Sequence, residues 1–197
     1  MTRILFVTHP DVVLDPAVPV PRWPLNARGR ERMAAFAQAV AGEGIAAVWT
    51  SDEQKALDGG DILSAALGVP HPVDPELGEN DRSATGYLAG PEFWEVVAAF
   101  FGRPDESVRG WETARHAQAR IVAAVARVAA AHPGQTIAIV SHGGVARLLT
   151  AHLQGVAIGD EARPGNPDGG CVLVFETEGA AIERVWTDVE DWPTSGR

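Results

Sequence analysis

The sequence predicts an α/β fold of three layers, in which helices cover both faces of a mainly parallel sheet. Two observations predict it. Short apolar runs, such as residues 4–7 and 137–140, have the length of buried strands, and amphipathic segments of helical period lie between them. Strand and helix alternate through most of the chain, as in sheets that are covered on both faces. At 197 residues, the chain is expected to form one domain, residues 1–197.

The elements follow from apolar periodicity and from Gly, Pro and capping residues. Asn26 is expected to cap one helix and Ser51 the next, and Glu178-Gly179 to form the turn between two paired strands. Two polar loops, 11–24 and 74–89, are long for a compact domain, and the second is a candidate lid or acid-bearing segment. Strands are expected at 4–8, 45–50, 136–140, 171–177 and 181–186, an extended segment at 68–73, and helices at 27–41, 51–67, 91–101, 111–131 and 144–153.

Composition excludes several classes of protein. The formal net charge is −10, with 16 Lys and Arg against 26 Asp and Glu and no basic run. Binding to nucleic acid or to an anionic membrane depends on neutralising phosphates, so neither partner is expected. No basic N-terminal region precedes a long apolar segment, which predicts a cytoplasmic location. The single Cys171 excludes an internal disulfide and is expected to be a small buried hydrophobe.

Two histidines stand where chemistry is expected. His9 and His142 each follow an apolar strand and precede a breaker, proline in one case and glycine in the other. Because ligands of parallel α/β sheets bind at the carboxyl ends of the strands, both imidazoles are expected in one crevice. A neutral imidazole is a competent nucleophile toward phosphorus. The remaining histidines show no spacing typical of a metal site, so no metal is predicted.

Four motifs occur in order: Thr8-His9-Pro10, Ser51 with Lys55-Ala56, Leu77-Gly78-Glu79 and Ser141-His142-Gly143-Gly144. Together they resemble the histidine phosphatase superfamily, the phosphoglycerate mutase-like group, over nearly the whole chain. The last block matches without change. In the first, the family has Arg-His-Gly, and in the second it has arginine where this chain has Lys55.

The resemblance implies a phosphomonoesterase that needs no cofactor and forms a phosphohistidine on His9. It implies that Glu79 is the proton donor, which would need a raised pKa and would afterwards deprotonate the attacking water. His142, Lys55 and the helix amides that follow Gly143 would hold the phosphoryl oxygens. The expected substrate is a phosphorylated small molecule or a phosphoprotein. Trp23 and Tyr87 are expected to line the mouth of the pocket.

The departures from the family pattern leave a gap in positive charge. Thr8 stands beside His9 where a phosphate-binding guanidinium is expected, and Lys55 offers a point charge in place of a planar fork. Arg22 and Arg82 are therefore predicted to supply the missing contacts. Two alternatives stay open, a weakened member that binds a phosphorylated ligand without turnover and a phosphomutase. The second is disfavoured because residues 74–109 are shorter than the usual insertion of such mutases. The oligomeric state is not predicted.

Overall fold

The computed structural model describes residues 1–177 and 181–193, and five strands in the order β2-β3-β1-β4-β5 form one sheet in this part of the chain. β1 pairs in parallel with β3, and β3 with β2, whereas β4 is antiparallel to both β1 and β5. Four strands therefore run in one direction, and β4 alone runs against them. The bounds are β1 (Arg3–Thr8), β2 (Ile45–Thr50), β3 (Thr136–Ser141), β4 (Cys171–Glu176) and β5 (Ile182–Asp188).

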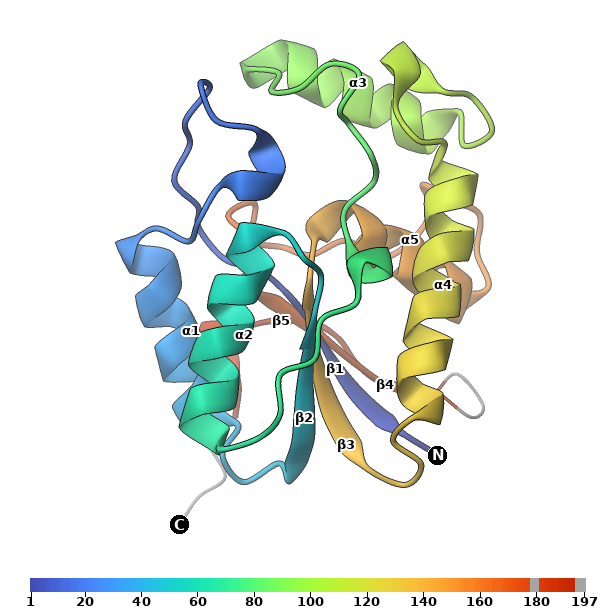
Figure 1. Ribbon diagram of the computed structural model, residues 1–197. Coiled ribbons are helices and arrows are strands. Elements are labelled where there is room, and N and C mark those ends of the chain that lie inside the picture. The colour runs from blue at the N-terminus through green and yellow to red at the C-terminus, as the bar shows by residue number, and fades with distance from the viewer. Residues whose placement is uncertain (178–180, 194–197) are drawn as a thin grey trace.

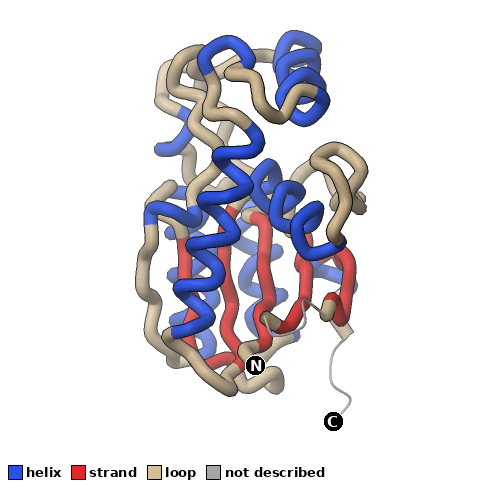
Figure 2. The backbone as a smooth tube through the Cα atoms, turned by 90° about the vertical axis from the view of Figure 1, so that its right-hand side faces the viewer, coloured by secondary structure: helices blue, strands red, loops and turns tan. Residues whose placement is uncertain are grey.

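Helices cover both faces of this sheet, which confirms the three-layer prediction. α1 and α2 lie on one face and α4 and α5 on the other, with the sheet between them (Figures 1 and 2). The α-helices are α1 (Ala27–Ala39), α2 (Gln54–Leu67), α3 (Gly90–Gly102), α4 (Ala114–Ala130) and α5 (Gly143–Gln154). Short 3-10 turns are η1 (Val20–Arg22), η2 (Pro75–Leu77), η3 (Val108–Gly110) and η4 (Val189–Asp191).

The central strand β1 is apolar at every interior position because both of its faces are buried. Leu5 and Val7 pack into the cluster beneath α1 and α2, and Ile4 and Phe6 pack into the cluster beneath α4 and α5. All four side chains have an exposed fraction of 0%. Burial of this extent, at roughly 1.5–3 kcal/mol for each large side chain, fixes the end of β1 in space and with it the position of His9.

The ends of the helices confirm one predicted cap and correct another. Asn26 caps α1, since its side chain accepts a hydrogen bond from the amide of Gly29. The prediction that Ser51 caps α2 is wrong, because the helix begins at Gln54 with Glu53 as its N-cap residue. α4 begins at Ala114, three residues later than expected. The predicted turn at Glu178-Gly179 lies outside the described residues.

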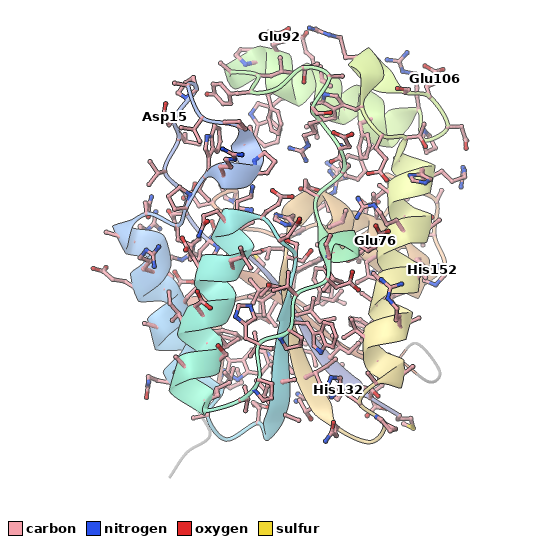
Figure 3. The ribbon with its side chains drawn as sticks, in the orientation of Figure 1. Asp15, Glu76, Glu92, Glu106, His132 and His152 are labelled. Atoms are coloured by element: carbon pink, nitrogen blue, oxygen red, sulfur yellow. The ribbon has the colours of Figure 1, made fainter. Side chains whose placement is uncertain are left out.

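A small helical cap lies over the carboxyl ends of the parallel strands. It consists of α3 and η3, and loop 11–24 rises beside it (Figure 1). Phe100, Trp111 and Leu148 belong to the apolar cluster that joins this cap to α4 and α5. Asp15, Glu92 and Glu106 lie at this end of the molecule, and His132 at the opposite end (Figure 3).

The segment 68–73 runs beside β2 but forms no strand of its own. Its single ladder contact is a parallel bridge between Thr50 and Val73. Among the described residues, no helix is both long enough and apolar enough to span a bilayer.

Candidate active site

The parallel register of β1 and β3 brings the two predicted histidines together. Thr8 pairs with Ser141, so that His9 and His142 follow at adjacent strand ends. Their ring centroids lie 5.3 Å apart, at an interplanar angle of 64°. The two imidazoles are therefore neighbours at the carboxyl end of the sheet, although only His9 lines the cavity described below.

His9 is held as a neutral ring with one nitrogen available. Its Nδ1 lies 3.0 Å from the carbonyl oxygen of Pro10. A carbonyl oxygen only accepts, so Nδ1 carries the hydrogen and Nε2 keeps its lone pair. Burial, followed by the nearby His142 and Lys55, lowers the pKa of His9 to about 3. His9 is therefore neutral near pH 7, as a nucleophile toward phosphorus requires.

His142 is the N-cap residue of α5 and is completely buried. Its Nε2 lies 2.7 Å from the hydroxyl oxygen of Ser51 and 3.4 Å from Oε1 of Glu53. Burial is the main cause of the lowered pKa of His142. Within the described residues its Nδ1 has no hydrogen-bond partner. A buried nitrogen without a partner is costly, so Nδ1 is available to a ligand.

Lys55 and Glu53 form a buried ion pair behind the two histidines. Nζ of Lys55 contacts Oε2 of Glu53 and donates to the carbonyl oxygen of Val20 at 3.0 Å. Oε1 of Glu53 accepts from the amide of Glu79 at 2.9 Å. Burial opposes ionisation of Glu53, but His142 and Lys55 outweigh it and lower the pKa of Glu53 to about 2. The carboxylate is therefore ionised and held against the cation expected to bind phosphate.

Glu53 is a residue of the candidate site that sequence reasoning missed. A carboxylate at the start of a helix is ordinarily explained by the helix dipole, and that explanation was sufficient from the sequence alone. One signal in the sequence could have identified Glu53. It lies two residues before Lys55, close to the predicted strand end that carries Ser51.

Glu79 occupies the N-terminus of α5. Its two carboxylate oxygens accept hydrogen bonds from the amides of Gly144 and Val145, each at 2.9 Å. A Cβ at position 144 would lie 2.5 Å from Oε1 of Glu79, so a larger residue there would displace this carboxylate. Arg82 approaches Oε2 at 3.1 Å.

The expectation of a raised pKa for Glu79 is wrong for this arrangement. Burial raises it, but Arg82, His142 and the Gly144 amide together lower the pKa below its ordinary value. The helix amides that were expected to hold phosphate are occupied by this carboxylate.

A cavity of about 860 Å³ opens in front of these groups. Of the predicted site residues, five line it: Thr8, His9, Glu79, Arg82 and Gly143. Lys55 and His142 are buried and do not line it, although Val20, which accepts from Lys55, does. Arg22 is exposed and does not line the cavity, so the structure does not bring it to the site.

Two of the lining residues have other partners than the sequence suggested. The hydroxyl of Thr8 accepts from the amide of Cys171 at 3.0 Å, and it thereby joins the end of β1 to β4. Arg82 donates to Oδ1 of Asn80 at 3.0 Å and lies 4.9 Å from the ring centroid of Trp111. The Thr8 side chain is committed to the sheet, whereas the Arg82 guanidinium stays beside Glu79 at the cavity wall.

Several aromatic side chains line the cavity. Trp23 and Tyr87 line it, as expected, and their ring centroids lie 5.3 Å apart. Trp94 also lines it and is 61% exposed. The other aromatic lining residues are Phe93, Phe101 and Trp111. Such a lining suits an apolar or aromatic group.

The opposite wall of the cavity is the loop 163–169, which is fixed at both ends. Before it, Arg147 and the buried Glu161 form an ion pair at 2.6 Å. After it, Gly169 packs against the backbone of His9, and any side chain at this position would collide with the His9 carbonyl oxygen. Gly170 also donates to the carbonyl oxygen of Thr8 at 3.1 Å. The loop is thus attached directly to the strand end that carries His9.

Metal-ligand geometry is not found in the described ranges 1–177 and 181–193, where no three His, Cys, Asp or Glu side chains gather in an arrangement that could hold an ion.

Comparison with known proteins identifies the family of this chain. The sequence model of the histidine phosphatase superfamily (branch 1) matches residues 20–188, so the chain belongs to this superfamily. A search of curated proteins found no match.

Solved structures share the fold at about one-fifth identity. Bacillus stearothermophilus YhfR has a TM-score of 0.76 and 20% identity, and the alignment covers 92% of this chain and 94% of that one. A mycobacterial glucosyl-3-phosphoglycerate phosphatase in complex with inorganic phosphate has a TM-score of 0.74, 19% identity and coverage of 95% and 98%. The alpha-ribazole phosphatase of Shigella flexneri has a TM-score of 0.68, 21% identity and coverage of 91% and 93%.

Proposed function

We propose that this protein is a phosphomonoesterase that works through a phosphohistidine on Nε2 of His9. The observation that carries the proposal is the His9 ring itself. It is neutral, fixed through Nδ1 to the Pro10 carbonyl oxygen, and it lines a large cavity beside a second, buried histidine. Covalent catalysis of this kind divides one difficult displacement at phosphorus into two easier ones.

For each step of the hydrolysis, the site holds a side chain that could transfer the proton or bind the phosphoryl oxygens. In the first step, Nε2 of His9 bonds to phosphorus and the ester oxygen leaves with a proton. A bound phosphoryl group raises the pKa of Glu79 by like-charge repulsion, so this carboxyl can carry that proton to the leaving oxygen. In the second step, Glu79 removes a proton from water, and the oxygen attacks phosphorus and releases His9. Nδ1 of His142 and the Arg82 guanidinium are the donors available to the phosphoryl oxygens.

The cavity favours a small molecule over a phosphoprotein as substrate. Its volume of about 860 Å³ lies in the range of roughly 300–1,000 Å³ typical of small-ligand pockets. The aromatic lining that includes Trp23, Tyr87 and Trp94 favours an ester whose organic part is aromatic or otherwise apolar. Two structural neighbours, a glucosyl-3-phosphoglycerate phosphatase and an alpha-ribazole phosphatase, support the same class of reaction.

The test uses the purified full chain with an aryl phosphate. We expect release of inorganic phosphate and, after acid-free denaturation, an acid-labile and base-stable phosphoryl adduct on the protein. His9→Gln is expected to lose the adduct and to lower kcat on the order of 10⁴-fold or more. His152→Gln is the matched control, since His152 is an exposed histidine on α5. Turnover that survives in His9→Gln would refute the proposal.

One observation favours a second function, binding of a phosphorylated ligand without turnover. Glu53 already holds Lys55, and Glu79 already occupies the α5 amides, so the donors for a transition state are partly engaged. The loss of one such donor can cost about 10²–10³ in rate. A protein that is stabilised against heat by phosphate, but forms no adduct and releases no phosphate, would establish this function instead.

A further inference from the structure

The charges around His9 balance. Lys55 is paired with Glu53, and Arg82 is paired with Glu79. Both carboxylates are well buried, with side-chain exposures of 12% and 16%. His9 contributes no charge near neutral pH. These two pairs therefore hold two cations and two anions, and their net charge is zero. The cavity is also lined by Asp11, Arg147, Arg163 and Asp168, of which Asp11 pairs with Arg32 and Arg147 with Glu161.

Glu53 is the anion that a ligand cannot easily move. Three of its contacts come from different elements: Lys55 on α2, the amide of Glu79 after η2, and Nε2 of His142 before α5. Glu79, in contrast, is held mainly by the helix amides and by Arg82, and a phosphoryl group could take over those same donors. Glu53 does not line the cavity, but its charge acts on His9, so an oxyanion bound to His9 would still lie in the field of this fixed carboxylate.

We propose that Glu53 is a specificity-determining residue that makes the pocket select singly charged phosphoryl groups, either the monoanion of a phosphate monoester or a phosphodiester. Like charges at such distances repel strongly when solvent is excluded, so each further negative charge on the ligand is disfavoured. The net charge of −10 on the chain acts in the same direction. A monoester that enters as its monoanion also brings the proton that its leaving oxygen needs. The inference deepens the proposed function and rests on it only for the choice of phosphoryl ligands.

The ionisable groups His9, Glu53, Glu79 and His142 all have pKa values below their ordinary ones. Burial, His142 and Lys55 keep the pKa of His9 at about 3, and His142 has a lowered pKa as well. The pKa of Glu53 is about 2, and that of Glu79 is lowered. Because a bound phosphoryl group raises the pKa of Glu79, a change in binding with pH reports the charge of the ligand where phosphate shows it and sulfate does not.

The experiment is calorimetric titration of the full chain with inorganic phosphate at about pH 5 and about pH 8.5, where the ligand carries mainly one and mainly two charges. We expect the wild-type Kd to be at least about tenfold lower at the acid pH. Sulfate carries two charges at both pH values and is the control for any effect of pH on the protein. For turnover, the matched pair is an aryl phosphate and its methyl diester, and the inference predicts measurable cleavage of the diester.

Glu53→Gln removes the charge and keeps the size of the side chain. We expect it to tighten phosphate binding at about pH 8.5 at least fivefold and to change the acid value less than twofold. Glu31→Gln, at an exposed position of α1, makes the same change in net charge away from the site. Glu53→Asp keeps the charge and should keep the preference of the wild type for the monoanion. This second variant still tests the inference if Glu53→Gln folds poorly.

Equal or tighter wild-type binding of the dianion would overturn the inference, and so would equal responses of Glu53→Gln and Glu31→Gln. Absence of phosphate binding at both pH values would also overturn it. A retained preference for the monoanion in a protein that forms no adduct would support the inference and refute only the proposed phosphatase.

Discussion

The ends of β1 and β3 start from similar sequences and place their histidines in different surroundings. Each strand is apolar and ends in a hydroxyl residue and a histidine, Thr8-His9 in one case and Ser141-His142 in the other. His9 lines the cavity, and its Nδ1 contacts a backbone carbonyl oxygen. His142 is completely buried, and its Nε2 faces Ser51 and Glu53. The strand pattern sets the position of each histidine. The groups that contact its ring nitrogens distinguish His9 from His142.

The partners differ in what they do to the ring. A carbonyl oxygen fixes the tautomer of His9 without adding charge, which leaves Nε2 as a nucleophile. The Glu53 carboxylate stabilises a positive ring at His142, and this ring would form as negative charge gathers on a phosphoryl group. His9 is therefore suited to attack, and His142 to stabilise the charge that follows.

Among the tests of the difference between the two histidines, His142→Gln is expected to have the largest effect. Loss of one donor to the developing charge is expected to lower kcat by about 10²–10³-fold, while the adduct on His9 still forms at a reduced rate. Rapid-quench measurement of adduct formation with an aryl phosphate separates this outcome from loss of the nucleophile. An equal and complete loss of the adduct in His142→Gln and His9→Gln would remove the distinction between the two histidines.

The pH dependence of stability tests the neutral state of His9. The unfolded chain binds a proton at this residue below about pH 6.5, but the folded chain does so only near pH 3. The free energy of unfolding therefore falls as the pH falls through this window, by about 2 kcal/mol or more. Denaturant unfolding at several pH values should show a shallower fall for His9→Gln than for the wild type. Parallel curves for the two proteins would contradict the lowered pKa.

The smallest expected effect concerns Ser51, which bonds to His142 and has no contact with His9. Ser51→Ala removes the 2.7 Å hydrogen bond to Nε2 and should lower the free energy of unfolding by about 1–2 kcal/mol. Because Glu53 remains, the decrease in kcat is expected to be no more than about tenfold. Denaturant unfolding and steady-state assays of the same preparation measure both quantities. A loss as large as that of His142→Gln would show that the hydroxyl, and not the carboxylate, positions the ring.

Local sequence signals were sufficient for most of the fold. The apolar run Ile4–Val7 predicted that β1 is buried on both faces, and Asn26 predicted where α1 begins. The cap at Ser51 was predicted wrongly because a serine before an acidic turn satisfies the local rule equally well. Its hydroxyl instead meets His142, a residue 91 positions away in the sequence. No local pattern carries that information.

The sequence predicted which residue types form the candidate site. It did not predict which of these side chains contact one another. His9 and His142 could be placed because strand ends have a fixed place in a parallel sheet. The pKa direction of Glu79 depends on the amides of α5 and on Arg82, which only the fold brings to it. Arg22 was expected in the pocket to replace lost charge, yet the path of a proline-rich loop cannot be derived from its composition. Glu53 was missed because its partners lie on three elements.

The attachment of loop 163–169 has a consequence for protein engineering. The Arg147–Glu161 pair precedes this loop, and Gly169, which must remain glycine beside the His9 backbone, closes it. Between these two points, residues 163–168 line the cavity without belonging to a helix or strand. Two of these residues contact other elements, Asp168 through Arg28 and Asn166 through Asp188, so libraries that vary the other four positions are expected to change the choice of substrate while the nucleophile stays in place.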